Sequence, residues 1–171
     1  MSQPFTFVLG GAASGKSAYA EQLVTSAPPP WTYIATAQAY DTEMASKIDI
    51  HRARRGPGWV TVEAPLTLPS ALATQSSGVV LVDCVTLWLS NLLLAETDPE
   101  PETRALLDAI KAAPVPVVVV SNEVGQGVVP AHALGRRFRE AQGRLNIALA
   151  AQADCAVQIV AGLPNVLKGA P

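Results

Sequence analysis

The segment GGAASGKS at residues 10–17 constrains the fold of this chain more than any other feature. Its spacing, G-x-x-x-x-G-K-S, is that of a phosphate-binding loop, and it stands between a strand-like apolar run at residues 5–9 and a helix-forming run at residues 18–24. Glycine permits backbone conformations that are closed to residues with a Cβ, so successive amides can turn inward around a phosphate. The plain alternative is a glycine-rich strand-to-helix turn with an exposed lysine.

Every residue of this segment is a candidate nucleotide ligand: Gly10, Gly11, Ala12, Ala13, Ser14, Gly15, Lys16 and Ser17. The amides and the positive end of the following helix would form an anion cradle. Lys16 would reach the β and γ phosphates as a catalytic cation, and the Ser17 hydroxyl would be a ligand to Mg²⁺. The sequence therefore predicts a bound nucleotide with Mg²⁺ as its cofactor.

Strand-like and helix-like runs alternate along the rest of the chain. Strands are expected at residues 31–36, 59–64, 79–82, 116–120 and 155–160. Helices are expected at residues 41–55, 66–74 and 86–96, then from an exposed acidic linker at residues 97–102 to about residue 112, and over a long final segment. This order predicts an α/β fold that is P-loop NTPase-like (RecA-like), with a mostly parallel sheet and helices on both faces. A chain of 171 residues has the size of one domain, so we expect residues 1–171 to form a single nucleotide-binding domain.

The final helix has an apolar face. Its members are Leu134, Phe138, Ala141, Leu145, Ala148 and Leu149. This face and the tail GLPNVLKGAP could take part in subunit contacts, and we expect a homo-oligomer.

Composition excludes several classes of protein. The formal net charge of −2 argues against nucleic acid as a partner, because a phosphate backbone calls for a basic face. The longest apolar region, residues 78–95, is broken by Asp83, Ser90 and Asn91, so we expect a buried strand and a helix and no membrane span. Cys84 and Cys155 form no metal-ligand pair and are expected to be reduced thiols in the core of a cytoplasmic protein.

Two carboxylates follow buried strands. Asp83 comes directly after GVVLV and could hold Mg²⁺ beside the phosphates, although Asp is also a common helix cap. Glu123, after the strand at residues 116–120, is the second choice. The stretch SNEVGQG has glutamate where the guanine-reading Asn-Lys-x-Asp motif has lysine, which argues against a switch GTPase and favours a small-molecule kinase or nucleotidyl transferase.

The segment YDTEMASKIDIHRARRGPGW carries one of the two histidines of the chain. On a helix that begins after Asp41, four cationic or imidazole residues fall near one face: Lys47, His51, Arg54 and Arg55. Neighbouring positive charges favour the neutral imidazole, which is a nucleophile, and arginines would neutralise a phosphate that it attacks. The alternative is a solvated basic helix face with an incidental histidine.

Four blocks in this order resemble the bifunctional adenosylcobinamide kinase / adenosylcobinamide-phosphate guanylyltransferase family of cobalamin biosynthesis. They are GGAASGKS, YIATAQAYDTEMASKIDIHRARRGPGWVTVEAP, VDCVTLWLSNLLL and SNEVGQGVVPAHALGRRFREAQGRLNIALAAQAD, which together span nearly the whole chain. The resemblance implies phosphorylation of adenosylcobinamide with ATP or GTP, then transfer of GMP from GTP to adenosylcobinamide phosphate through a guanylyl-histidine.

The same resemblance implies roles for particular residues. His51 corresponds to the family's nucleophilic histidine. Further nucleotide contacts correspond to Thr36, Ala37, Gln38, Arg52, Ala53, Arg54, Arg55, Glu63 and Asp83. The position of Asp83 can be glutamate in the family, which would keep the metal role but change its reach. Two other functions stay open: a P-loop small-molecule kinase of another pathway with a structural His51, and a non-catalytic nucleotide-sensing regulator.

Overall fold

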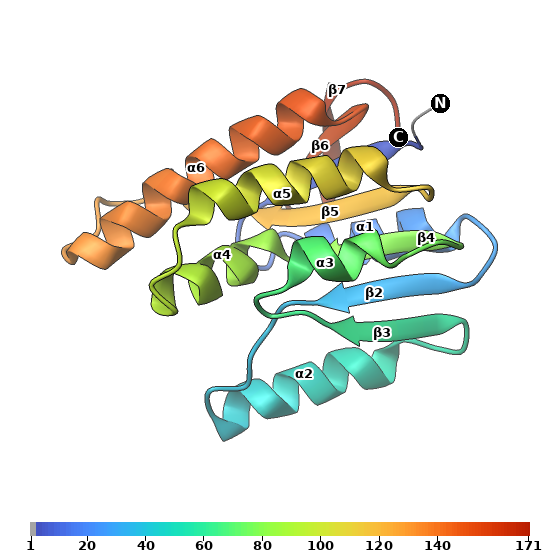
Figure 1. Ribbon diagram of the computed structural model, residues 1–171, viewed down its shortest axis with the longest axis horizontal. Helices are drawn as coiled ribbons and strands as arrows, with labels where there is room; N and C mark the ends of the chain where they lie inside the picture. Colours follow the sequence, from blue (N-terminus) through green and yellow to red (C-terminus); the bar gives the residue numbers. More distant parts are fainter. Residues whose placement is uncertain (1–2) are drawn as a thin grey trace.

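The computed structural model describes residues 3–171 and contains one seven-stranded sheet (Figure 1). Its strands are β1 (Phe5–Gly10), β2 (Trp31–Ala35), β3 (Trp59–Glu63), β4 (Val79–Asp83), β5 (Val117–Asn122), β6 (Cys155–Val160) and β7 (Leu163–Lys168). Their order in the sheet is β3-β2-β4-β5-β1-β6-β7, and only the β6–β7 pair is antiparallel among the described residues. The predicted α/β fold with a mostly parallel sheet is confirmed.

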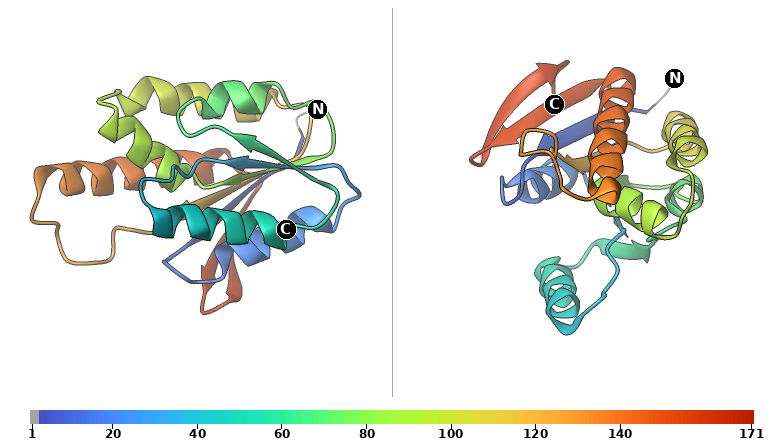
Figure 2. Two further views of the ribbon diagram at one scale, coloured as in Figure 1. Left: turned by 90° about the horizontal axis from the view of Figure 1, so that it is seen from below. Right: turned by 90° about the vertical axis from the view of Figure 1, so that its left-hand side faces the viewer.

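Helices cover both faces of the sheet (Figure 2). They are α1 (Lys16–Thr25), α2 (Thr42–Arg54), α3 (Leu68–Ala73), α4 (Val85–Leu94), α5 (Pro99–Ala112) and α6 (Ala133–Gln152). The buried side chains of α3 to α6 pack together with one face of the sheet, and those of α1 pack with the other. α2 lies outside this packing, beside the β2–β3 edge, and none of its residues is buried.

The core explains why the central strands β4 and β5 are largely apolar. Along β5, Val117 and Val119 pack with the α3–α6 side, while Val118 and Val120 pack with the α1 side. Successive side chains of a strand point to opposite faces, so a strand that is covered on both sides needs no polar alternation. Parallel pairing also places the carboxyl ends of β1, β2, β4 and β5 side by side. The phosphate loop follows β1 at this end of the strands.

One expectation about the chain path is wrong, and one strand was not predicted. Residues 99–102 are not a linker, because α5 begins at Pro99 after Asp98, whose carboxylate accepts a hydrogen bond from the Glu100 amide at 3.1 Å. Proline at the first helical position needs no backbone donor, so the acidic, proline-rich run starts the helix. The tail also contains the additional strand β7, which pairs with β6 through a turn at Ala161 and Gly162.

The inner face of α6 is more polar than predicted. Leu134 is 48% exposed, whereas Gln142 and Asn146 are buried. Asn146 Oδ1 accepts a hydrogen bond from the Ser121 hydroxyl at 2.5 Å and from Gln142 Nε2 at 2.9 Å. The apolar pattern missed these residues because their amides bond to one another and to the end of β5, which makes their burial possible.

The two cysteines lie in the interior of the protein. Cys84 and Cys155 are both buried and free, as predicted. Burial, followed by the charge of Asp83, raises the pKa of Cys84 to about 11.

Within residues 3–171, no helix combines the length and apolar character that crossing a membrane requires.

Candidate nucleotide site

The phosphate loop joins the end of β1 to the first turn of α1. Gly15 caps α1 with φ of +92°, a left-handed conformation that favours glycine. A Cβ on Gly10 would lie 2.4 Å from the Ser14 hydroxyl oxygen and 3.0 Å from the Ile159 carbonyl oxygen, so this position favours glycine for a different reason. The sequence signal of the loop therefore has a local steric cause at two of its glycines.

Lys16 lies across this loop. Its side chain is largely buried, and Nζ donates a hydrogen bond to the Gly11 carbonyl at 3.0 Å. From the other side, the Gly162 amide in the β6–β7 turn donates to the Ser14 carbonyl at 2.8 Å. The loop is thus braced by its own lysine and by the additional hairpin, with its remaining amides at the positive end of α1.

Asp83 ends β4 at the same edge of the sheet. Its Oδ2 accepts a hydrogen bond from the Tyr33 hydroxyl of β2 at 3.0 Å. Burial is the largest cause that raises the pKa of Tyr33, followed by the charge of Asp83, while Arg55 acts in the opposite direction. Tyr33 therefore stays a neutral donor that orients the carboxylate.

A hollow of about 170 Å³ brings several predicted residues together. We call it the histidine hollow; its polar wall includes Ser17, Tyr33, His51, Arg52, Arg55 and Asp83. The wall thus combines the start of α1, the end of β4 and the last turns of α2, which are far apart in the sequence. His51 consequently lines the same hollow as the two predicted Mg²⁺ ligands.

Arg55 is the most unusual group in this wall. Its Cζ lies 3.6 Å from the centroid of the Tyr33 ring, and Nε and Nη1 are buried without a hydrogen-bond partner in the described structure. Buried charged donors are normally satisfied, because leaving them unpaired is costly. The unpaired donors fit an anion, and a phosphate group is the anion that the neighbouring loop predicts.

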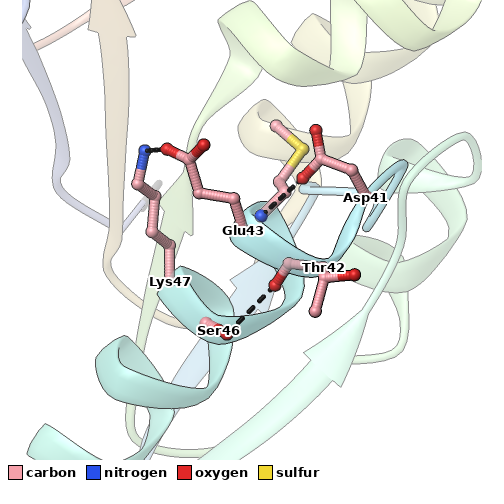
Figure 3. Close-up of polar contacts among 6 residues, drawn as sticks. Asp41, Thr42, Glu43, Ser46 and Lys47 are labelled. Atoms are coloured by element: carbon pink, nitrogen blue, oxygen red, sulfur yellow. Dashed lines mark hydrogen bonds and ion pairs between the residues drawn. The ribbon is translucent and has the colours of Figure 1, made fainter.

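Two of the residues expected on the cationic face of α2, Lys47 and Arg54, form ion pairs. Lys47 Nζ pairs with Glu43 at 2.6 Å in the first turns, where Asp41 accepts a hydrogen bond from the Met44 amide at 2.7 Å (Figure 3). Arg54 pairs with Glu21 of α1 at 3.6 Å. Neither Lys47 nor Arg54 belongs to the wall of the histidine hollow, and each forms an ion pair with a nearby carboxylate.

A larger hollow of about 620 Å³ adjoins the histidine hollow, and the two share Ala35, Ala37, Ile48 and Arg52 in their walls. It also contains Gln38 and Glu63, and Glu63 forms an ion pair with Arg52. Three residues that the resemblance implies are outside both walls: Thr36, Ala53 and Arg54. Ala53 is exposed on α2, and Thr36 is fully buried beneath the site.

Thr36 bonds to the backbone that follows β4. Its hydroxyl donates to the Cys84 carbonyl at 2.6 Å and accepts from the Cys84 amide at 3.0 Å. Asn91 of α4 donates to the Thr36 carbonyl at 2.8 Å. Sequence reasoning treated Asn91 only as a break in an apolar run and missed Tyr33 altogether; a lone buried amide in an apolar helix was the available signal.

The oxygen atoms in the histidine hollow fit Mg²⁺. Ser17 and Asp83 supply a hydroxyl and a carboxylate, and Mg²⁺ commonly takes one or two such protein ligands together with phosphates and water. In residues 3–171 there is no cluster of three or more His, Cys, Asp or Glu side chains that could hold a metal alone.

The sheet order, the loop and the strand-end carboxylate define an α/β protein of the P-loop NTPase-like class. The fold is similar along its length to a solved structure from Pyrococcus horikoshii OT3, with a TM-score of 0.56 at 9% identity, covering 98% of this chain and 87% of that one. The chain belongs to the cobinamide kinase / cobinamide phosphate guanyltransferase family, whose model matches residues 6–167.

Curated relatives agree with this family. The chain is 46% identical over 169 residues to the bifunctional adenosylcobalamin biosynthesis protein CobP of Pseudomonas aeruginosa, covering 96% of this chain and 97% of the relative. It is 39% identical over 178 residues to the bifunctional adenosylcobalamin biosynthesis protein CobU of Salmonella typhimurium, covering 94% and 98%. The predicted family is confirmed.

Proposed function

We propose that this protein phosphorylates adenosylcobinamide with ATP or GTP and then transfers GMP from GTP to adenosylcobinamide phosphate, giving adenosylcobinamide-GDP in cobalamin biosynthesis. The family and the names of the relatives support the two activities. The single observation that favours a histidine route is the shared wall of His51, Ser17 and Asp83 in the histidine hollow.

In the first half of GMP transfer, a ring nitrogen of His51 attacks the α phosphorus of GTP. A nitrogen–phosphorus bond forms, the bond to the bridging oxygen breaks, and pyrophosphate leaves. A phosphate oxygen of adenosylcobinamide phosphate then attacks the same phosphorus, and His51 is released. Dividing one transfer into two steps lets a single site accept two bulky substrates in turn.

The surrounding cations would stabilise the charge on the phosphates. Arg55 has two buried donors without a partner, and Arg52 borders the hollow beside the histidine. Lys16 would hold the leaving pyrophosphate in the amide cradle. Mg²⁺, held by Ser17 and Asp83, would neutralise phosphate charge when it is bound.

The second histidine of the chain offers a matched control. His132 precedes α6 and lies outside the histidine hollow. We expect His51→Ala to keep phosphorylation of adenosylcobinamide and to lose formation of adenosylcobinamide-GDP, whereas His132→Ala keeps both. GMP transfer by His51→Ala at the rate of the control would refute the histidine route and favour a direct transfer.

Two alternatives predict other outcomes. A kinase of another pathway would show no protein-bound label from α-labelled GTP, and a nucleotide-sensing regulator would bind nucleotide without turnover of adenosylcobinamide.

We also propose a cytoplasmic homo-oligomer, in keeping with the nucleotide substrates. The exposed Leu163, Val166 and Leu167 of β7 support subunit contacts, and sedimentation analysis tests them.

A further inference from the structure

A second hollow borders the phosphate loop, and the proposed histidine chemistry does not use it. We call it the glutamate hollow; it measures about 570 Å³, and its wall includes Gly11, Ser14, Glu123, Gln126 and Gln158. Among the described residues, its wall and that of the histidine hollow have no member in common. The loop therefore presents residues 11–14 to one hollow and Ser17 to the other.

The backbone of Glu123 is hydrogen-bonded to the first residue of the phosphate loop. It follows β5, the strand between β1 and β4, and its amide donates to the Gly10 carbonyl at 3.0 Å. The next carbonyl, that of Gly11, accepts from Lys16 Nζ at 3.0 Å. Glu123 thus lies beside the part of the cradle where Lys16 would hold the β and γ phosphates.

The carboxylate is also held in place. Its Oε1 accepts a hydrogen bond from the Gly125 amide, and the Gly125 carbonyl accepts one from Arg139 Nη2 of α6. Beneath it, the buried network of Ser121, Gln142 and Asn146 fixes the end of β5, and Asn146 Nδ2 reaches the Asn122 carbonyl at 3.3 Å. A strand end that is held by buried amides positions the group it carries more precisely than a free loop.

The two reactions of the proposed function act at opposite ends of a triphosphate. GMP transfer breaks a bond at the α phosphorus, whereas the kinase step breaks one at the γ phosphorus. With one cradle for both, the groups that act at the γ phosphorus belong on a different side of the loop from His51. A carboxylate beside bound phosphates is repelled by their charge, so its placement there is favourable only if it meets a proton donor or a cation.

We propose that the glutamate hollow receives the alcohol acceptor of the kinase step and that Glu123 is its general base. This inference rests on the proposed function and concerns only its first reaction. The acceptor hydroxyl gives its proton to the Glu123 carboxylate as its oxygen bonds to the γ phosphorus. The bond from that phosphorus to the bridging oxygen breaks, a nucleoside diphosphate leaves, and Glu123 returns the proton to solvent. An aspartate accepts the substrate proton in this way in protein kinases.

The test is Glu123→Gln, which keeps the shape of the side chain and removes the basic oxygen. Its control is Glu100→Gln, at an exposed carboxylate on α5 that pairs with Arg104. We expect kcat for phosphorylation of adenosylcobinamide, measured with ATP and with GTP, to fall by about 10²–10⁴-fold while KM values change little. Labelling of His51 by α-labelled GTP is expected to continue at the rate of the control, which also shows that the variant is folded.

Three results would overturn the assignment. The first is an unchanged kinase kcat in Glu123→Gln. The second is a rise in KM for the triphosphate alone, which would make Glu123 a contact to the nucleoside. The third is an equal loss of both reactions. If Glu123→Gln fails to fold, Glu123→Asp, which keeps the carboxylate one methylene short, must show a reduced kinase kcat with intact labelling. A wild-type protein that does not phosphorylate adenosylcobinamide would instead contradict the proposed function.

Discussion

The guanidinium of Arg55 lies over the ring of Tyr33, 3.6 Å from its centroid, while the hydroxyl of the same ring donates to Asp83 at 3.0 Å. One aromatic side chain therefore contacts both the cation that we propose for phosphate and the carboxylate that we propose for Mg²⁺. The arrangement connects the end of α2, a helix without a buried residue, to the strands β2 and β4 of the parallel sheet.

Arg55→Lys should lower the rate of GMP transfer by about 10²–10³-fold, since lysine cannot reproduce the planar donors that are stacked on Tyr33. The phosphorylation rate should change less, because we expect the γ phosphorus to bind near Lys16. Rates of the two reactions, measured separately, test this. Arg137→Lys, on the surface of α6, is the control, and equal rates of GMP transfer in the two variants would remove Arg55 from the account.

Lys16→Ala should weaken both reactions by at least about 10²-fold, because we expect both donors to use one cradle. GTP should then no longer raise the melting temperature as it does for the wild type, since ligand binding to the folded state is what stabilises it. Full guanylylation in Lys16→Ala would show that the two triphosphates bind at separate loops.

Local motifs explain why much of the fold could be predicted. The loop is set by steric requirements at Gly10 and Gly15, and buried parallel strands such as β5 have a composition that few other elements share. The β7 strand was missed because its six residues are exposed and its pairing depends on a hairpin turn at Gly162. A strand without a buried face leaves no periodic signal.

The types of residue in the candidate site could be predicted from the sequence, but which of their side chains lie together was harder to predict. Helical spacing placed Lys47 and Arg54 near one face with His51, but it could not predict their ion pairs with Glu43 and Glu21. The position of Arg52 and Arg55 in the hollow depends on how α2 meets the sheet, which is a tertiary contact that spacing does not contain.

Cys84 should resist alkylation in the folded protein at pH 8, because burial raises its pKa from 9.0 to about 11. Since the folded pKa is the higher one, its contribution to stability is full below pH 9 and is lost as the pH rises to about 11. A loss on the order of 2–3 kcal/mol in the free energy of unfolding is expected over that interval. Denaturant titrations of wild type and Cys84→Ala test it; parallel pH curves would be inconsistent with a buried thiol.

Helix α2 should exchange its amide hydrogens faster than α4, because α2 has no buried residue whereas α4 has seven. GTP with Mg²⁺ should slow exchange in the last turns of α2, where His51 and Arg52 lie, and should leave its first turns less affected. Hydrogen exchange followed by mass spectrometry measures both. Uniformly slow exchange in ligand-free α2 would show that this helix is held more firmly than its burial indicates.

The most direct measurement is to map the covalent GMP adduct after incubation of the full-length protein with GTP and Mg²⁺, with digestion at alkaline pH, where a phosphoramidate survives. The account predicts the mass of GMP on the peptide that contains His51 and its loss after acid treatment. An adduct on His132 or on a lysine, or no adduct during active formation of adenosylcobinamide-GDP, would contradict it.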